Sequence, residues 1–365
     1  MKKSSLWHFF LIFCSVAGIA GIFAIRMMDP RRTVSRDGLS MDTVVRMTAS
    51  AAKSEAELGE ILEGAFGLLD EMEQKFSMRD PDSEISAVNA ASGAEWVKIS
   101  RDTYAVLASS VNAARLTGGA FDPTVGALTL LWQRRLADGK IPEDGEITEA
   151  VRKTGFRKLL LSAPDGAFLD IPGGSVDLGG IAKGYASAAV RDYLREKGIT
   201  SALIDLGGNV VAMGGRAERG ETERAPWRVG IQHPAKPRGA PICVLDISEG
   251  AVITAGVYER FREVGGRRYT HIFVPETGRP VDGELESVTV VSNDPAQADA
   301  LSTAFMVMGE REALRLLSII PGCDAVFVSR GARRADAYRI TATAGLEGML
   351  QPSASEAPVE FYDAR

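Results

Sequence analysis

Residues 293–309 read N-D-P-A-Q-A-D-A-L-S-T-A-F-M-V-M-G, and this stretch is the most informative part of the chain. Asp294 followed by Pro295 predicts the start of a helix, because Asp caps helix N-termini well and Pro is tolerated in the first turn. Gly309 predicts the end of the helix. The residues between them are apolar almost all round, which is typical of a buried helix.

This predicted helix carries two oxygen-bearing side chains on one face. Asp299 and Thr303 lie one turn apart. A buried carboxylate costs several kcal/mol unless another group compensates its charge. Carboxylate and hydroxyl oxygens are ligands that Mg²⁺ prefers, so a metal ion is one candidate for that group. The alternative is stabilisation by the helix dipole and nearby N–H groups, and the helix alone favours this alternative.

Composition limits the classes of protein to which the chain can belong. Its 365 residues, 45% of them hydrophobic, suffice for one large domain or two ordinary ones. The net charge is −6 and no basic stripe is visible, so we expect no nucleic-acid partner. Cys14, Cys243 and Cys323 form neither a disulfide framework nor a metal-binding spacing. We expect Cys243 and Cys323 to be small buried hydrophobic residues.

The N-terminus predicts a membrane or export segment. Lys2 and Lys3 precede an uncharged, mostly apolar run from Leu6 to Ile25, which is long enough to cross a bilayer. We expect residues 1–28 to be an uncleaved signal anchor in the inner membrane; a cleaved signal peptide is the alternative. Positive charges flank the run on both sides, so the positive-inside rule does not determine on which side of the membrane the soluble part lies. The soluble part is expected on the periplasmic side, with a cytosolic orientation left open.

The rest of the chain divides into a linker, one domain and a tail. We predict a polar linker at 29–40, an α+β domain at 41–348 and a polar, partly loose tail at 349–365. Periodicity predicts helices at 54–75, 101–116 and 182–197. It predicts strands at 43–49, 202–205, 210–213, 227–231, 242–247, 251–254, 287–291 and 325–329.

Three glycine-rich segments could let the backbone approach a phosphate group closely. They are T-G-G-A-F-D-P-T at 117–124, D-L-G-G-I-A-K-G-Y at 177–185 and D-L-G-G-N at 205–209. The second ends a predicted strand and opens a helix, whose N–H groups can face an anion. None matches the dinucleotide or P-loop patterns. Taken singly, each also fits an ordinary turn between elements.

Together and in this order, the segments resemble the ApbE family of FAD:protein FMN transferases. The resemblance runs from about Met41 to Ile340 and draws its specificity from the order of its parts. The matching segments are M-D-T at 41–43, F-S-M-R-D-P-D-S-E-I-S at 76–86, G-G-A-F-D-P-T at 118–124, V-D-L-G-G-I-A-K-G-Y-A at 176–186, D-L-G-G-N at 205–209, T-A-G-V-Y-E-R at 254–260, Y-T-H-I-F-V-P-E-T-G-R-P at 269–280 and A-D-A-L-S-T-A at 298–304.

The resemblance implies an α+β fold that holds FAD in a cleft between two lobes. It implies a Mg²⁺-dependent enzyme that moves FMN from FAD to a Thr hydroxyl of an acceptor protein through a phosphoester bond and releases AMP. Three alternatives remain: an FAD pyrophosphatase that uses water as acceptor, a flavin-binding protein without turnover, and an unrelated anchored solute-binding protein. The ordered motifs disfavour the last of these.

The resemblance also assigns roles to residues by position. The metal ligands would be the Gly180 carbonyl, Asp299 and Thr303, and the catalytic residues Asp299 and His271, with His271 beside the reacting phosphate as a base or an orienting donor. The FAD contacts would be Met41, Arg79, Ala120, Phe121, Asp122, Asp177, Lys183 and Ile272.

Two positions depart from the family pattern. The family often has Gly where Asp42 stands, and Tyr packing on the flavin where Arg79 stands. Arg also stacks on aromatic rings, so Arg79 is retained as an expected flavin contact.

Overall fold

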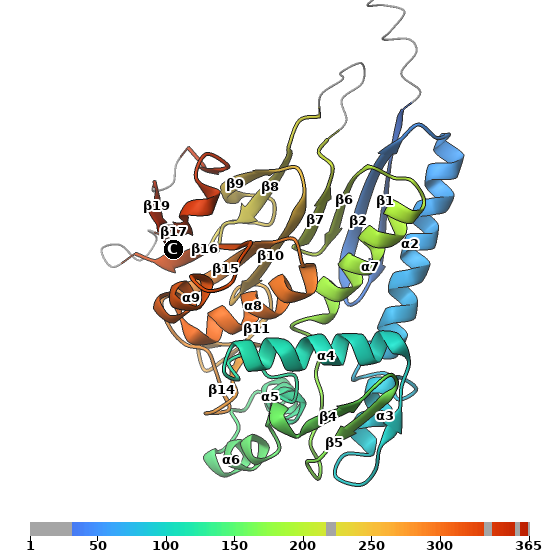
Figure 1. The fold of residues 1–365 in the computed structure, drawn as a ribbon. Helices are drawn as coiled ribbons and strands as arrows, with labels where there is room; N and C mark the ends of the chain where they lie inside the picture. The colour runs from blue at the N-terminus through green and yellow to red at the C-terminus, as the bar shows by residue number, and fades with distance from the viewer. Residues whose placement is uncertain (1–30, 217–223, 332–337, 355–357, 364–365) are drawn as a thin grey trace, which may run out of the picture.

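The computed structural model describes residues 31–216, 224–331, 338–354 and 358–363. A mixed nine-stranded sheet forms its largest part (Figure 1). In spatial order its strands are β1 (Arg32–Ser40), β2 (Thr43–Ala51), β6 (Ser201–Leu206), β7 (Asn209–Met213), β10 (Gly250–Gly256), β15 (Leu285–Ser292), β16 (Cys323–Arg330), β17 (Tyr338–Thr343) and β19 (Val359–Tyr362). The pair β17–β19 is parallel, and the preceding pairs are antiparallel.

Three helices cover one face of this sheet. They are α2 (Glu55–Phe76), α7 (Ala182–Glu196) and α8 (Pro295–Met308), and α7 and α8 run across the middle strands in Figure 1. Their buried side chains join those of the strands in the main hydrophobic core. A smaller sheet covers the other face and forms a second core with it. Its strands are β18 (Leu350–Pro352), β9 (Pro241–Ile247) and β8 (Trp227–Gln232).

The remaining elements lie mainly at one end of the large sheet (Figure 1). The helices among them are α3 (Glu84–Ala90), α4 (Arg101–Leu116), α5 (Gly126–Ala137), α6 (Asp144–Arg152) and α9 (Glu310–Leu317), with short 3₁₀ turns η1 (Phe156–Lys158) and η2 (Ala344–Leu346). The strands are β3 (Val97–Lys98), β4 (Leu159–Ser162), β5 (Gly166–Leu169), β11 (Phe261–Val264), β12 (Arg267–Thr270), β13 (Phe273–Val274) and β14 (Arg279–Pro280).

The buried helix predicted from residues 293–309 is confirmed. The Asp294 side chain caps it by accepting hydrogen bonds from the amides of Ala296 and Gln297. Gly309 ends it with φ 78°, a left-handed conformation that favours glycine. The other predicted helices and strands are also present, with ends shifted by at most a few residues.

Two predicted boundaries are wrong. The segment 29–40 was expected to be a linker, but Arg32–Ser40 forms strand β1. As an edge strand, β1 pairs with only one neighbouring strand. Along β1, only Val34 and Ser40 are buried. The tail 349–365 likewise contains β18 and β19, which pair with β9 and β17. Edge strands need few apolar residues, which is why the sequence pattern did not reveal them.

The predicted signal anchor at residues 1–28 lies outside the described residues. Among the residues that the structure does describe, no helix is long and apolar enough to span a membrane. Cys243 and Cys323 are buried free thiols, as expected. Burial raises the pKa of each thiol to about 12, which keeps both protonated.

Candidate active site

A cleft of about 880 Å³ opens where the β1–β2 turn, the α2–α3 and α4–α5 loops, the start of α7 and the face of α8 meet. Its volume falls within the range of about 300–1,000 Å³ that is usual for ligand pockets. All of the site residues predicted from the sequence line it, although they come from segments far apart in the chain. They are Met41, Arg79, Ala120, Phe121, Asp122, Asp177, Gly180, Lys183, His271, Ile272, Asp299 and Thr303.

Asp299 is a buried carboxylate with little compensation for its charge. Its side chain is 4% exposed, and its Oδ2 atom accepts a hydrogen bond of 2.8 Å from the amide of Gly184. Within the described residues this is the only hydrogen bond to the carboxylate, and no Lys, Arg or His nitrogen lies within 4.0 Å of it. One amide stabilises a buried carboxylate only partly. The position is therefore suited to a further cationic partner.

Gly184 allows α7 and α8 to approach closely at this carboxylate. A Cβ atom built on Gly184 would lie 2.2 Å from the Pro295 carbonyl oxygen and 2.7 Å from the Asp299 Cβ. Both distances are far below van der Waals contact. Any other residue at this position would push the two helices apart and lengthen the hydrogen bond to Asp299.

We therefore expect Gly184→Ala to lower the free energy of unfolding by about 1–3 kcal/mol, the usual cost of forced overpacking. The matched control is Gly145→Ala in α6, where a Cβ would meet nothing within 4 Å. That change should leave stability equal or slightly higher, since Ala is the better helix former. Urea unfolding measures both. Equal stabilities for the two variants would contradict the proposed close packing of α7 on α8.

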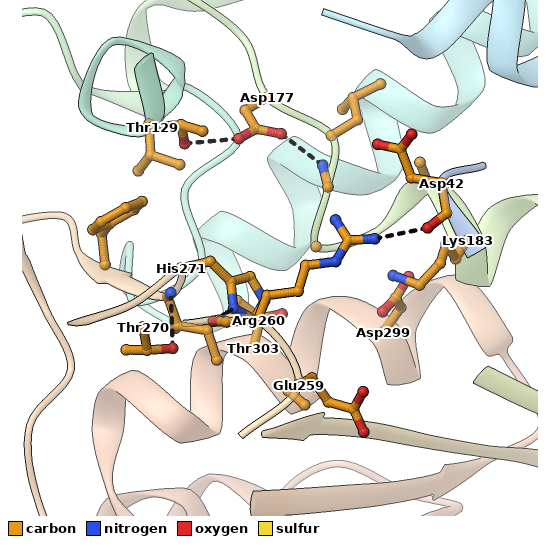
Figure 2. A pocket seen from close by; sticks show the side chains of 18 of the residues that line it. Asp42, Thr129, Asp177, Lys183, Glu259, Arg260, Thr270, His271, Asp299 and Thr303 are labelled. Carbon is orange, nitrogen blue, oxygen red and sulfur yellow. Dashed lines mark hydrogen bonds between the residues drawn. The ribbon is translucent and has the colours of Figure 1, made fainter. Parts of the chain in front are cut away.

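Gly180 and Thr303 lie close together in the wall of the cleft. A Cβ atom built on Gly180 would lie 3.1 Å from the Thr303 hydroxyl oxygen and 3.1 Å from the Phe121 ring. Thr303 follows Asp299 by one turn of α8 (Figure 2). In the described part of the chain, no three His, Cys, Asp or Glu side chains gather as a metal site. One carboxylate with a hydroxyl and a carbonyl oxygen is instead a donor set suited to Mg²⁺.

His271, between β12 and β13, faces the same cleft with a defined proton position. Its Nδ1 atom lies 2.9 Å from the backbone oxygen of Arg260. A carbonyl oxygen only accepts, so Nδ1 carries the proton and Nε2 keeps a free lone pair. His271 is an exposed residue at the cleft, and neighbouring protein atoms crowd its ring enough to desolvate it in part. This crowding, with the charges of Arg260 and Lys183, lowers the pKa of His271 below its usual value near 6.5.

Asp122 and Asp177 use their oxygens to shape the walls of the cleft. Asp122 is buried and accepts hydrogen bonds from Thr124 and from the Phe156 amide. Burial raises the pKa of Asp122, against the effect of these hydrogen bonds. Asp177 accepts from the Gly179 amide and from the Thr129 hydroxyl, at 2.8 Å each. We infer that both carboxylates order loops of the cleft.

Asp42 and Arg79, the two residues that depart from the family pattern, contact each other. Arg79 donates to the Asp42 carboxylate at 2.8 Å, and both side chains are more than half exposed, at 57% and 59%. An exposed ion pair of this kind contributes about 0–1 kcal/mol to stability. Its main consequence is therefore to fix the direction of the Arg79 side chain at the cleft.

Asp42 also belongs to a strained turn. Met41 and Asp42 join β1 to β2 with φ values of 53° and 58°. Tight two-residue hairpin turns of type I′ need positive φ at both central positions. The Arg260 side chain donates to the Asp42 backbone oxygen at 3.4 Å (Figure 2). The Glu73 carboxylate accepts from the Met41 amide at 2.7 Å. The turn is thus held from α2 and from the loop before β11.

Sequence reasoning gave no role to Glu73 or Thr129, which hold cleft residues in place. Glu73 lies in the last turn of α2 and Thr129 in α5, and neither belongs to a recognisable motif. His233 has a structural environment, because it packs edge-on against the Tyr338 ring with a centroid distance of 5.0 Å. Asp205 caps the turn before β7 by accepting from the Gly208 amide at 2.9 Å.

Comparisons with known proteins identify the family to which the chain belongs. The model of the ApbE family matches residues 41–327. The chain therefore belongs to the ApbE family, and the predicted resemblance is confirmed.

Curated relatives share this similarity over most of their length. The FAD:protein FMN transferase of Treponema pallidum is 33% identical over 338 residues, which are 90% of this chain and 92% of that protein. The protein of the same name from Escherichia coli K12 is 32% identical over 284 residues, covering 76% of this chain and 79% of that protein.

Solved structures confirm the mixed α+β fold. The flavin transferase ApbE from Vibrio cholerae superposes with a TM-score of 0.73 at 29% identity and covers 88% of this chain and 100% of its own. The ApbE protein from Thermotoga maritima gives a TM-score of 0.72 at 32% identity, over 82% of this chain and 94% of its own.

Proposed function

We propose that this protein transfers FMN from FAD to a Thr hydroxyl of an acceptor protein, forms a phosphoester bond and releases AMP. One observation carries the proposal: a single cleft joins the under-compensated Asp299 carboxylate, Gly180, the Thr303 hydroxyl, and His271 with its Nδ1 atom bonded to the Arg260 carbonyl. Relatives named FAD:protein FMN transferase support it.

FAD would lie in this cleft, between the elements of the large sheet and those at its end. The residues proposed to contact it line the cleft: Met41, Arg79, Ala120, Phe121, Asp122, Asp177, Lys183 and Ile272. Since both oxygens of Asp122 already accept hydrogen bonds, from Thr124 and from the Phe156 amide, its segment would meet FAD mainly through backbone groups. Lys183, at the start of α7, would place a positive charge near the pyrophosphate.

The donors around Asp299 fit a Mg²⁺ ion. Asp299, the Thr303 hydroxyl and the Gly180 carbonyl would hold it, and it would supply positive charge to the pyrophosphate oxygens, which phosphoryl transfer requires. The buried carboxylate would then have the compensation that it lacks in the protein alone. This support rests on the donor set of the chain itself.

His271 would act on the acceptor hydroxyl. Its Nε2 lone pair accepts the Thr proton while the Thr oxygen bonds to the phosphorus of the FMN half. The bond from that phosphorus to the bridging oxygen breaks, and AMP leaves with the bridging oxygen. The Arg260 carbonyl holds the Nδ1 proton throughout, which keeps Nε2 directed at the cleft.

Incubation with FAD, MgCl₂ and a candidate acceptor protein tests the proposal, with mass measurement of the acceptor and detection of AMP. Transfer adds one FMN to the acceptor and none to its Thr→Ala variant. AMP and free FMN without acceptor modification would instead identify an FAD pyrophosphatase. Bound FAD without any AMP would identify a flavin-binding protein.

We further propose that the run Leu6–Ile25 anchors the protein in the inner membrane with its soluble part on the periplasmic side, where it would meet its acceptor. The support is an uncharged run long enough to cross a bilayer. Fractionation of cells that express the full-length chain should recover it in the membrane fraction at full mass. A shortened form in the soluble periplasmic fraction would show a cleaved signal peptide instead.

A further inference from the structure

Asn209 places an unpaired polar group in the wall of the cleft. The residue is 2% exposed and lines the cleft. Its Nδ2 atom is buried, and the described residues offer it no hydrogen-bond acceptor. Buried polar groups in folded proteins nearly always have a partner, because an unmet donor is costly. Asn209 ends the third glycine-rich segment, D-L-G-G-N, to which the catalytic scheme gives no role.

The position of Asn209 directs it toward the proposed substrate site. It is the first residue of β7 and pairs with Leu206 of β6 and with Ile253 of β10. Residues paired across strands share one face of a sheet, and Leu206 and Ile253 both belong to the core beneath α7 and α8. The carboxamide therefore lies on the face of the sheet that α7 and α8 cover, and these two helices carry Lys183 and Asp299.

A carboxamide is suited to the edge of a heteroaromatic ring. It offers one acceptor oxygen and two N–H donors side by side, and Asn pairs in this way with the N6 and N7 atoms of adenine in nucleic-acid recognition. FAD contains two edges with neighbouring donors and acceptors: the adenine ring and the pyrimidine part of the flavin. Both present the same hydrogen-bonding chemistry to Asn209.

We propose that Asn209 is a binding residue whose carboxamide hydrogen-bonds the polar edge of one ring system of FAD. The proposal rests on the proposed function, because it takes FAD as the ligand of the cleft. It explains why the free protein carries a buried donor without a partner: the ligand supplies the acceptor. It predicts opposite effects of one substitution on stability and on binding.

Asn209→Leu keeps the approximate size of the side chain and removes both polar atoms. In the free protein it removes an unpaired donor, so the melting temperature should be equal or higher. The dissociation constant for FAD should rise about tenfold, because the bound ring edge loses its hydrogen bonds. Thermal unfolding without ligand and titration of flavin fluorescence measure the two effects on the full-length chain.

Two further variants control this experiment. Ser287→Ala changes another fully buried polar residue, on β15 and outside the cleft lining, and should leave FAD affinity unchanged. Asn209→Asp keeps the shape and removes the donor. It should also weaken FAD binding, and it decides the question if Asn209→Leu does not fold.

Separate titrations with FMN and with AMP identify the ring. If the Asn209 variants bind FMN more weakly than the parent does but bind AMP equally well, Asn209 lies at the flavin edge. If they bind AMP more weakly but FMN equally well, Asn209 lies at the adenine. Unchanged affinity of both Asn209 variants for FAD, FMN and AMP overturns the proposal. So does a lower melting temperature of Asn209→Leu with unchanged FAD affinity, since the amide would then have an internal partner.

Failure of the proposed function gives a different result. A parent protein that binds none of the three ligands contradicts FAD as substrate before any variant is compared. A parent that binds FAD without transferring FMN leaves the comparison of the Asn209 variants valid, because binding is measured without turnover.

Discussion

Replacing Asp299 with Ala should abolish Mg²⁺-dependent release of AMP from FAD while the fold stays largely intact. Asp299 supplies the carboxylate of the proposed donor set with Gly180 and Thr303, and a hard divalent cation binds weakly to neutral oxygens alone. In the free protein the carboxylate is buried with one amide partner, so its removal relieves a desolvation cost and leaves a small cavity. We expect these two effects on stability largely to cancel.

Asp299→Asn is the sharper variant, because it keeps the side-chain shape and an acceptor for the Gly184 amide. It should be as inactive as Asp299→Ala, with a melting temperature equal to or above that of the parent. MgCl₂ together with FAD should raise the melting temperature of the parent, since ligands that bind the native state stabilise it, and should raise that of Asp299→Asn much less. Full activity in either variant would remove the metal assignment.

The parts of the fold that were predicted well are those with a strong local signal. Helix α8 has a cap, a Pro in its first turn, an apolar surface and a terminating Gly, and all of these agree. The α2 helix begins at the Ser54 cap, where Glu57 completes a capping box. Such elements are set by residues close together in the sequence, so a single chain reveals them.

The elements that were missed depend on neighbours distant in the sequence. Strand β1 is mostly polar, and its pairing with β2 is what makes it a strand. Helix α5 begins without a side-chain cap at Val125 and buries a short stripe around Trp132. Tertiary contacts override weak local preferences in these segments.

The candidate site shows the same division. Asp299, Lys183 and His271 were predicted because each lies in a motif of several residues, and the structure places them in one cleft. The ion pair between Asp42 and Arg79 was not predicted, because the two residues lie 37 positions apart in the sequence and meet only in the fold. The unpaired amide of Asn209 is likewise visible only once its surroundings in the sheet are known.

His271→Ala should lower FMN transfer by roughly 10²–10⁴-fold, the usual contribution of a general base, with FAD affinity changed little. The reason is the free Nε2 lone pair, which the hydrogen bond from Nδ1 to the Arg260 carbonyl leaves available. Transfer rates at saturating FAD and acceptor, with separate FAD titrations, measure the two quantities. Loss of FAD binding in proportion to activity would make His271 a binding residue and the catalytic role wrong.

The dependence of the rate on pH tests the same assignment. The pKa of His271 is lowered below its usual 6.5, chiefly by desolvation of the imidazole, against the opposing effect of its hydrogen bond to the Arg260 carbonyl. The charges of Arg260 and Lys183 lower the pKa further, and the charge of Asp177 raises it. A base must be unprotonated, so kcat/KM should fall as the pH drops through this lowered pKa, at values below 6.5, and stay level above it. In the profile of kcat against pH, the phosphates of bound FAD favour the protonated ring. The fall in rate at low pH, the acidic limb of the profile, should therefore move to higher pH. His271→Ala should lose the limb in both profiles, and a limb that persists unchanged in the variant would assign it to another group.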